Sequence, residues 1–160
     1  MFNTHKNVHH NATLGDDILR YKKNKLAGNL ALLGIVFNCL YFMLLYSVND
    51  PFLYKLLVGI SIICTLAVLL AGFYASEAIK GYDKKFSIVL IVLAVVQIIR
   101  IFILPLQGLN QSALNTHYFG AELGSGATFA WLLIWLVLSA ACFAGSAYGA
   151  ILLLPNLKST

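Results

Sequence analysis

Residues 86–106 read FSIVLIVLAVVQIIRIFILPL, an apolar stretch that carries Gln97 and Arg100 within it. As an α-helix rising about 1.5 Å per residue it would be about 31 Å long. This length matches the roughly 30 Å hydrocarbon core of a bilayer. Arg100 is the only charged residue in the interior of an apolar stretch of this chain. The stretch therefore predicts a membrane-spanning helix with an ionisable group inside the membrane, which is a candidate functional position.

The composition predicts one all-α, polytopic membrane domain. Hydrophobic residues make up 60% of the 160 residues and charged residues only 11%, which is far from the balance of a soluble domain. Four apolar stretches of spanning length predict a bundle of four transmembrane helices over 26–154. The predicted spans are 26–46, 52–76, 86–106 and 127–154. A polar segment, 1–25, precedes them, and a short tail, 155–160, follows.

The polar segment 1–25 contains one periodic stretch. Leu14, Ile18 and Tyr21 recur at helical spacing, which predicts a short amphipathic helix lying on the membrane surface. His5, His9 and His10 precede it, but nothing in the surrounding sequence fixes them as metal ligands.

The distribution of lysine and arginine predicts the topology. Eight of them lie near span ends on the side that holds the N-terminus, the 77–85 loop and the C-terminus: Arg20, Lys22, Lys23, Lys25, Lys80, Lys84, Lys85 and Lys158. The other side has only Lys55. By the positive-inside rule both termini are cytoplasmic, as expected for a multi-pass protein of the cell membrane. Because these basic residues flank apolar segments, the net charge of +5 indicates membrane topology and not a nucleic-acid partner.

The predicted spans and topology also predict a buried polar layer. Counted from the cytoplasmic face at about 1.5 Å per residue, Asn38 lies at ~18 Å, Gln97 at ~16 Å and Arg100 at ~21 Å. Ser61, counted from the other side, falls at a similar level. The amide groups of Asn38 and Gln97 are suited to accept hydrogen bonds from the Arg100 guanidinium. Tyr41 is instead expected near the membrane interface with Phe42 and Tyr46, because aromatic rings favour that level.

Three interpretations of Arg100 stay open at this point. The side chain can snorkel to the interface, since Leu106 is only about 9 Å away along the helix. It can belong to a structural polar cluster, or pair with the carboxylate of a partner subunit. It can also hold an anionic substrate or a lipid phosphate. The spans contain no carboxylate or histidine of their own, which argues against a proton-coupled carrier.

The fourth span has a face of small residues. Ala141, Gly145 and Gly149 repeat at four-residue spacing, a pattern that allows close approach of another helix. Packing within the chain and docking onto another protein or a second copy both explain it.

Catalytic, metal and cofactor signatures are not found. The sequence contains no HExxH, GxSxG, Walker A or GxGxxG motif and no paired intramembrane carboxylates. His117 and Glu122 in the predicted external loop 107–126 are too few for a metal site. We therefore expect a protein that is not an enzyme and has no cofactor.

Three segments carry a resemblance to a known group: KNKLAGNLALLGIVFNCLYFMLLY (23–46), FYASEAIKGYDKKFS (73–87) and QIIRIFILPLQ (97–107). They resemble uncharacterised four-span integral membrane proteins of Gram-positive bacteria, similar to proteins encoded beside ABC transporters. The resemblance implies an accessory subunit and assigns no functional residue.

Two functional hypotheses follow from these observations. The first is a non-catalytic accessory or structural subunit of a larger membrane transport complex, in contact with membrane lipids and other membrane subunits. The second is a small self-associating carrier or channel that binds an anion or lipid headgroup through Arg100 and Gln97.

Overall fold

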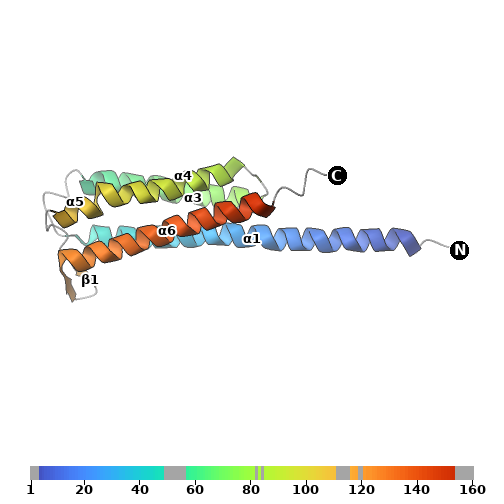
Figure 1. The fold of residues 1–160 in the computed structure, drawn as a ribbon, viewed down its shortest axis with the longest axis horizontal. Coiled ribbons are helices and arrows are strands. Elements are labelled where there is room, and N and C mark those ends of the chain that lie inside the picture. The colour runs from blue at the N-terminus through green and yellow to red at the C-terminus, as the bar shows by residue number, and fades with distance from the viewer. Residues whose placement is uncertain are drawn as a thin grey trace.

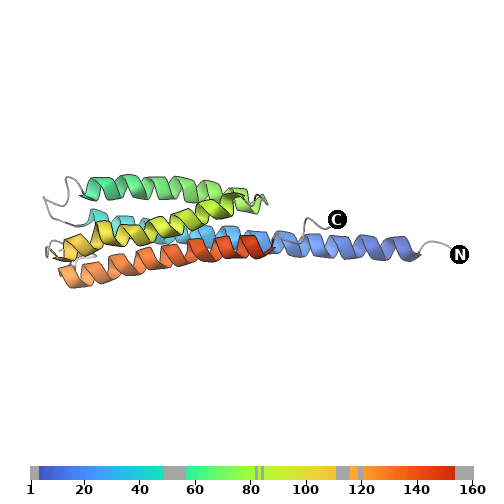
Figure 2. The ribbon, with the colours of Figure 1, turned by 45° about the horizontal axis from the view of Figure 1, so that its top comes forward.

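The computed structural model describes residues 4–48, 57–81, 83, 85–110, 116–118 and 121–153. Four long helices form an antiparallel bundle (Figures 1 and 2): α1 (Thr4–Tyr46), α3 (Leu57–Lys80), α4 (Lys85–Ile103) and α6 (Ser125–Leu153). Each of the four contains a segment long and apolar enough to cross a membrane: 25–46, 59–80, 85–103 and 125–152. The prediction of an all-α bundle of four spanning helices is confirmed.

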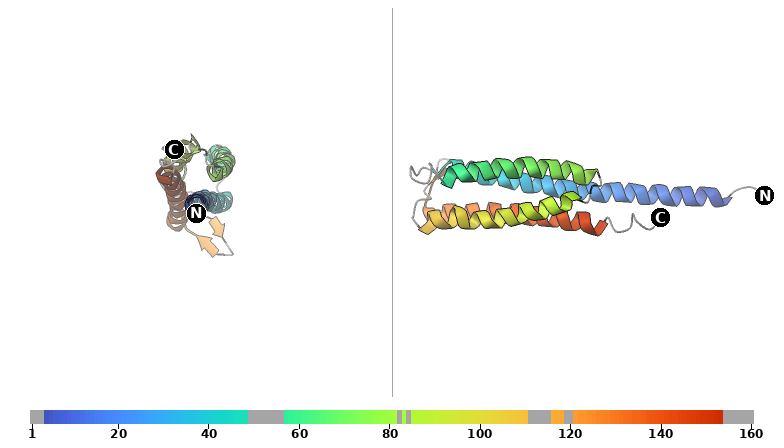
Figure 3. Two further views of the ribbon diagram at one scale, coloured as in Figure 1. Left: turned by 90° about the vertical axis from the view of Figure 1, so that its right-hand side faces the viewer. Right: turned by 90° about the horizontal axis from the view of Figure 1, so that it is seen from above.

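The four helices form a closed ring of contacts around one core. Helix α1 packs against α3 and α6, and α4 packs against the same two helices. The end-on view in Figure 3 shows this square arrangement. We name the two ends of the bundle by their connections. The turn end is where α3 ends at Lys80 and α4 begins at Lys85, and the hairpin end is the opposite one.

Each helix buries one face with helical periodicity. The six buried residues of α4 are three or four positions apart along one face, with one adjacent pair: Ser87, Leu90, Leu93, Ala94, Gln97 and Arg100. This spacing brings side chains to the same side of an α-helix. It explains why Gln97 and Arg100 face the core, while large apolar residues between them, such as Ile98 and Ile99, are exposed on the face suited to lipid.

The core consists of two apolar clusters. The cluster nearer the turn end includes Ala31, Leu90 and Phe143. The cluster nearer the hairpin end includes Leu44 and Leu136. Buried polar residues of all four helices lie between these two levels, and they form the site described below.

Helix α1 is longer than predicted. It begins at Thr4 and passes through Lys25 into the first span without a break, so the expected separate short helix is replaced by one helix of 43 residues. No proline interrupts 4–46, and the lysines near the membrane are good helix formers. The N-terminal part of α1 projects beyond the turn end of the bundle (Figure 1). The amphipathic character of this part, and its place on a membrane surface, stay predictions.

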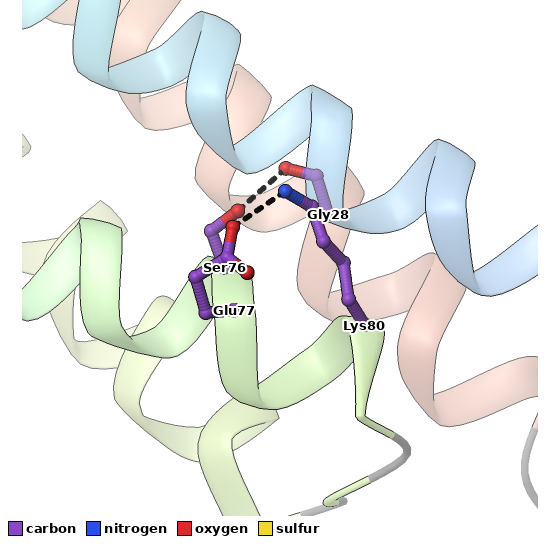
Figure 4. A network of polar contacts seen from close by, with 4 residues as sticks. All are labelled: Gly28, Ser76, Glu77 and Lys80. Atoms are coloured by element: carbon purple, nitrogen blue, oxygen red, sulfur yellow. Dashed lines mark hydrogen bonds and ion pairs between the residues drawn. The ribbon is translucent and has the colours of Figure 1, made fainter.

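Helix α3 also ends later than expected. The charged residues of 77–85 predicted a loop after Ser76, but α3 continues to Lys80. Figure 4 shows the reason. The Lys80 ammonium group pairs with Glu77 three residues earlier, with Nζ and Oε1 2.6 Å apart. The aliphatic part of Lys80 covers Gly28 of α1, where a Cβ would lie 2.6 Å from its Cγ. The aliphatic stem of Lys80 therefore packs against α1, while its ammonium group stays at the end of α3 and pairs with Glu77.

The hairpin end contains structure that the sequence did not predict. Helix α4 ends at Ile103, three residues before the predicted end, and a short helix α5 (Pro105–Asn110) follows. Within the predicted loop 107–126, strands β1 (Thr116–Tyr118) and β2 (Ala121–Leu123) pair antiparallel. His117 and Glu122 are opposite each other in this register. Val48, just after α1, forms an isolated bridge with Thr116, so the ends of α1 and β1 are joined by backbone pairing.

Candidate functional site

Arg100 lies at the centre of the buried polar residues. Its side chain is only 2% exposed and donates hydrogen bonds to groups on three helices. Nη1 donates to Asn38 Oδ1 of α1 at 2.8 Å and to Gln97 Oε1 of α4 at 2.7 Å. Nη2 donates to Thr65 Oγ1 and, at 3.5 Å, to the Ser61 carbonyl oxygen, both on α3. Two amide oxygens, a hydroxyl and a carbonyl therefore accept from one guanidinium.

Gln97 extends this network to the fourth helix. Its Nε2 donates to Asn38 Oδ1 at 3.0 Å and to Ser139 Oγ of α6 at 2.8 Å. Ser139 in turn donates to the Gly34 carbonyl oxygen of α1 at 2.8 Å. Side chains from α1, α3, α4 and α6 are thus connected in one hydrogen-bonded layer, which we call the polar layer: Asn38, Tyr41, Ser61, Thr65, Gln97, Arg100 and Ser139.

Several side chains of the polar layer donate hydrogen bonds to backbone carbonyl oxygens of the helices. Besides the Ser139 bond to Gly34, Asn38 Nδ2 donates to the Thr65 carbonyl oxygen at 3.4 Å and Thr65 Oγ1 to the Ser61 carbonyl oxygen at 2.7 Å. Arg100 donates four hydrogen bonds, more than any other residue of the layer. Because a guanidinium has only donors and the surrounding groups can all accept, the layer can keep a cation buried without a carboxylate.

Tyr41 completes the layer from the hairpin side. The sequence placed this ring at the membrane interface, and that prediction was wrong, because the side chain is fully buried. The guanidinium carbon of Arg100 lies 4.6 Å from the centroid of the Tyr41 ring, within the range of a cation–π interaction. The hydroxyl of Tyr41 lies 3.1 Å from Ser61 Oγ. The ring therefore offers the cation a π face while its hydroxyl keeps a polar partner.

The structure brings together all four polar residues proposed from the sequence: Asn38, Ser61, Gln97 and Arg100. Arg100 points into the bundle, so snorkelling to the interface does not describe it. The hydrogen-bond acceptors of Arg100 within the described residues include no carboxylate. Its Nε–H is also without an acceptor there. Sequence reasoning missed Thr65, Ser139 and Tyr41 as members.

The small-residue face of α6 divides into two parts. A Cβ on Gly145 would lie 3.1 Å from Leu30 Cδ2, and one on Gly149 would lie 3.8 Å from Ala27 Cβ. These two glycines therefore pack against α1 of the same chain. Ala141 is exposed. It is the one member of the predicted motif that faces outward.

Serine hydroxyls join α1 to its neighbours at the turn end as well. Ser76 Oγ of α3 donates to the Gly28 carbonyl oxygen at 2.9 Å (Figure 4), and Ser146 Oγ of α6 donates to the Ala27 carbonyl oxygen at 2.6 Å. Ser87 of α4 is equally buried, but its hydroxyl has no hydrogen-bond partner among the described residues.

We expect Ser76→Ala to lower the free energy of unfolding by about 0.6–1 kcal/mol, the size of an interhelical hydrogen bond in a membrane protein. Ser87→Ala is the matched control, because it removes a hydroxyl with no partner and should leave stability unchanged or slightly higher. Unfolding by dodecyl sulfate in mixed micelles, followed by circular dichroism, measures both variants. Equal destabilisation by the two substitutions would contradict the assignment.

Comparison of the chain with protein-family models, with curated proteins and with solved structures found no match.

Proposed function

We propose that this protein is a non-catalytic accessory or structural subunit of a larger membrane transport complex. The observation that carries the structural part of the proposal is the burial of Arg100. The guanidinium is 2% exposed and donates four hydrogen bonds to groups of its own chain. A cation bound in this way contributes its donors to holding four helices together and leaves little capacity for a ligand.

The projecting part of α1 supports the subunit assignment. Residues 4–24 form about six helical turns outside the bundle (Figure 1). Most of the stability of a helix in a protein comes from tertiary packing and not from intrinsic propensity. This one contains Gly15, Asp16 and several Asn and Thr residues, which are poor helix formers. A surface of another molecule would supply the missing contacts, and a larger membrane assembly offers one.

The finer parts of the proposal rest on the sequence. The role in transport rests on the resemblance of the segments 23–46, 73–87 and 97–107 to proteins similar to those encoded beside ABC transporters. The location in the cell membrane, with both termini cytoplasmic, rests on the placement of eight basic residues near the span ends on one side.

One observation favours a second candidate, a self-associating carrier or channel for an anion or a lipid headgroup. Arg100 has no carboxylate partner within the described residues, and its Nε–H is unpaired there. A bound anion would neutralise the guanidinium and accept a hydrogen bond from its Nε–H. This candidate requires the bundle to open, because the present packing leaves no exposed surface at Gln97 and almost none at Arg100.

Purification of the tagged chain from its native membrane in mild detergent tests the proposal. We expect a stoichiometric complex with larger membrane proteins, identified by mass spectrometry. Deletion of residues 2–19 should release them, because it removes the projecting helix but retains Arg20, Lys22, Lys23 and Lys25, which set the topology. Ala141→Leu tests whether the exposed small residue of α6 contributes to the same contact.

A particle composed only of identical copies would overturn the subunit proposal. In that case, anion flux through vesicles containing the purified chain, together with its loss in Arg100→Ala, would establish the carrier instead.

A further inference from the structure

The turn end of the bundle carries a concentration of positive charge that the polar layer does not involve. Residues 20–25 and 77–85 together contain seven basic and two acidic residues. The connections of the opposite end, 47–56 and 107–124, contain one basic and two acidic residues. Each lysine or arginine near a membrane surface strengthens binding to anionic lipid by about fivefold.

We propose that the turn end binds the phosphate groups of anionic phospholipids, through Lys25 of α1 and Lys85 of α4 on either side of the Lys80–Glu77 pair of α3. This inference is independent of the proposed subunit role. The occupant is a lipid and not a soluble anion, because the lysines lie directly next to an exposed apolar surface.

Described contacts link α3 to α1 and, through the turn, to α4 at this end of the bundle. Lys80 covers Gly28, and Lys25 precedes Gly28 by three positions, so both lie over the same part of α1. Lys85 is the first residue of α4, and its backbone N–H donates to Asp83 Oδ1 at 3.1 Å. Within the described residues the ammonium groups of Lys25 and Lys85 are exposed and make no ion pair. Glu77 partly neutralises Lys80, so among the described side chains of this end Lys25 and Lys85 supply the available charge.

An apolar surface for acyl chains begins one turn deeper. Tyr74 of α3 and Phe86 of α4 meet edge to face, with ring centroids 5.1 Å apart, and bridge the two helices below the turn. Leu26, Tyr74 and Ile88 are all exposed. Leu26 follows Lys25 directly, and Ile88 follows Lys85 by three residues. A phosphate at the lysines therefore has apolar side chains available for the lipid tails on the membrane side.

Thermal unfolding of the purified full chain in a neutral detergent tests the site. We expect added phosphatidylglycerol to raise the unfolding temperature more than phosphatidylcholine, and native mass spectrometry to show retained phosphatidylglycerol. The double variant Lys25→Gln/Lys85→Gln should weaken the preference for phosphatidylglycerol by about 25-fold, from about fivefold for each lysine. High salt should weaken it in the wild type.

Lys55→Gln is the matched control, because it removes a lysine that the sequence places at the opposite end. Lys80 is kept, since its stem packs on Gly28 and its loss would disturb the fold. Equal protection by phosphatidylcholine would overturn the proposal, as would equal protection by inorganic phosphate, which would indicate a site for a free anion. An unchanged preference in the double variant would also overturn it.

Discussion

Asn38→Leu is expected to lower the free energy of unfolding by about 3–5 kcal/mol, the cost of removing one partner from a buried charge. Asn38 Oδ1 accepts from both Arg100 Nη1 and Gln97 Nε2. Leucine has a similar volume but no acceptor, so the guanidinium would keep its charge and lose one of its four hydrogen bonds. Dodecyl sulfate titration in mixed micelles measures the change.

A double-mutant cycle with Arg100→Leu provides the control. Once the cation is gone, the loss of the Asn38 acceptor should matter less, because replacing both partners by apolar groups is far less costly than replacing one. We expect the double variant to be more stable than the sum of the two single effects predicts, by about 2 kcal/mol, within the range found for directly interacting residues. Additive effects would show that Asn38 does not act through Arg100.

Gly34→Leu should have the second large effect, a loss of about 3 kcal/mol, at the upper end of the range for overpacking. A Cβ at Gly34 would lie 3.1 Å from the Phe143 ring and 3.2 Å from Cys142 Cβ. The Phe143 ring cannot easily move away, because it is fully buried and lies 3.4 Å from the Cβ position of Gly72 on α3. The larger side chain would push α1 and α6 apart.

Trp135 reports this separation directly. Its ring stacks on Phe37 of α1 with centroids 5.9 Å apart, so its fluorescence should change in Gly34→Leu even before unfolding. Gly59→Leu is the matched control, because among the described residues no atom from outside its own helix backbone lies within 4 Å of its Cβ position and leucine is the better helix former. If both leucine variants were equally stable, the α1–α6 contact at Gly34 would not be as close as described.

The levels of the polar residues could be predicted because a helix rises by a constant amount per residue. Once the span ends were located from Lys and Arg, the depths of Asn38, Gln97 and Arg100 followed by counting. The faces of the helices were harder to predict. Thr65 and Ser139 were missed because a hydroxyl in a span also suits a bond within its own helix, as Thr65 makes to Ser61.

Tyr41 was misplaced for a different reason. A tyrosine near a span end suits the membrane interface, but its hydroxyl and ring serve a buried cation equally well. Only the packing of α3 against α1, and the reach of the Arg100 side chain from α4, decide between them. The paired strands of 116–123 also escaped prediction. Strands of three residues are too short to show an alternating pattern, and their pairing depends on contacts such as that between Val48 and Thr116.

The unbroken course of α1 gives the molecule a mechanical property. A helix of 43 residues is about 65 Å long, and its hydrogen-bonded backbone resists both compression and twisting. The projecting end and Asn38 therefore belong to one continuous helix. When a partner holds residues 4–24 in helical form, a quarter-turn of this end about the helix axis would rotate Asn38 in the same direction and carry its side chain away from Arg100. Force applied at Thr4, beyond the turn end of the bundle, would in this way reach the polar layer at its centre.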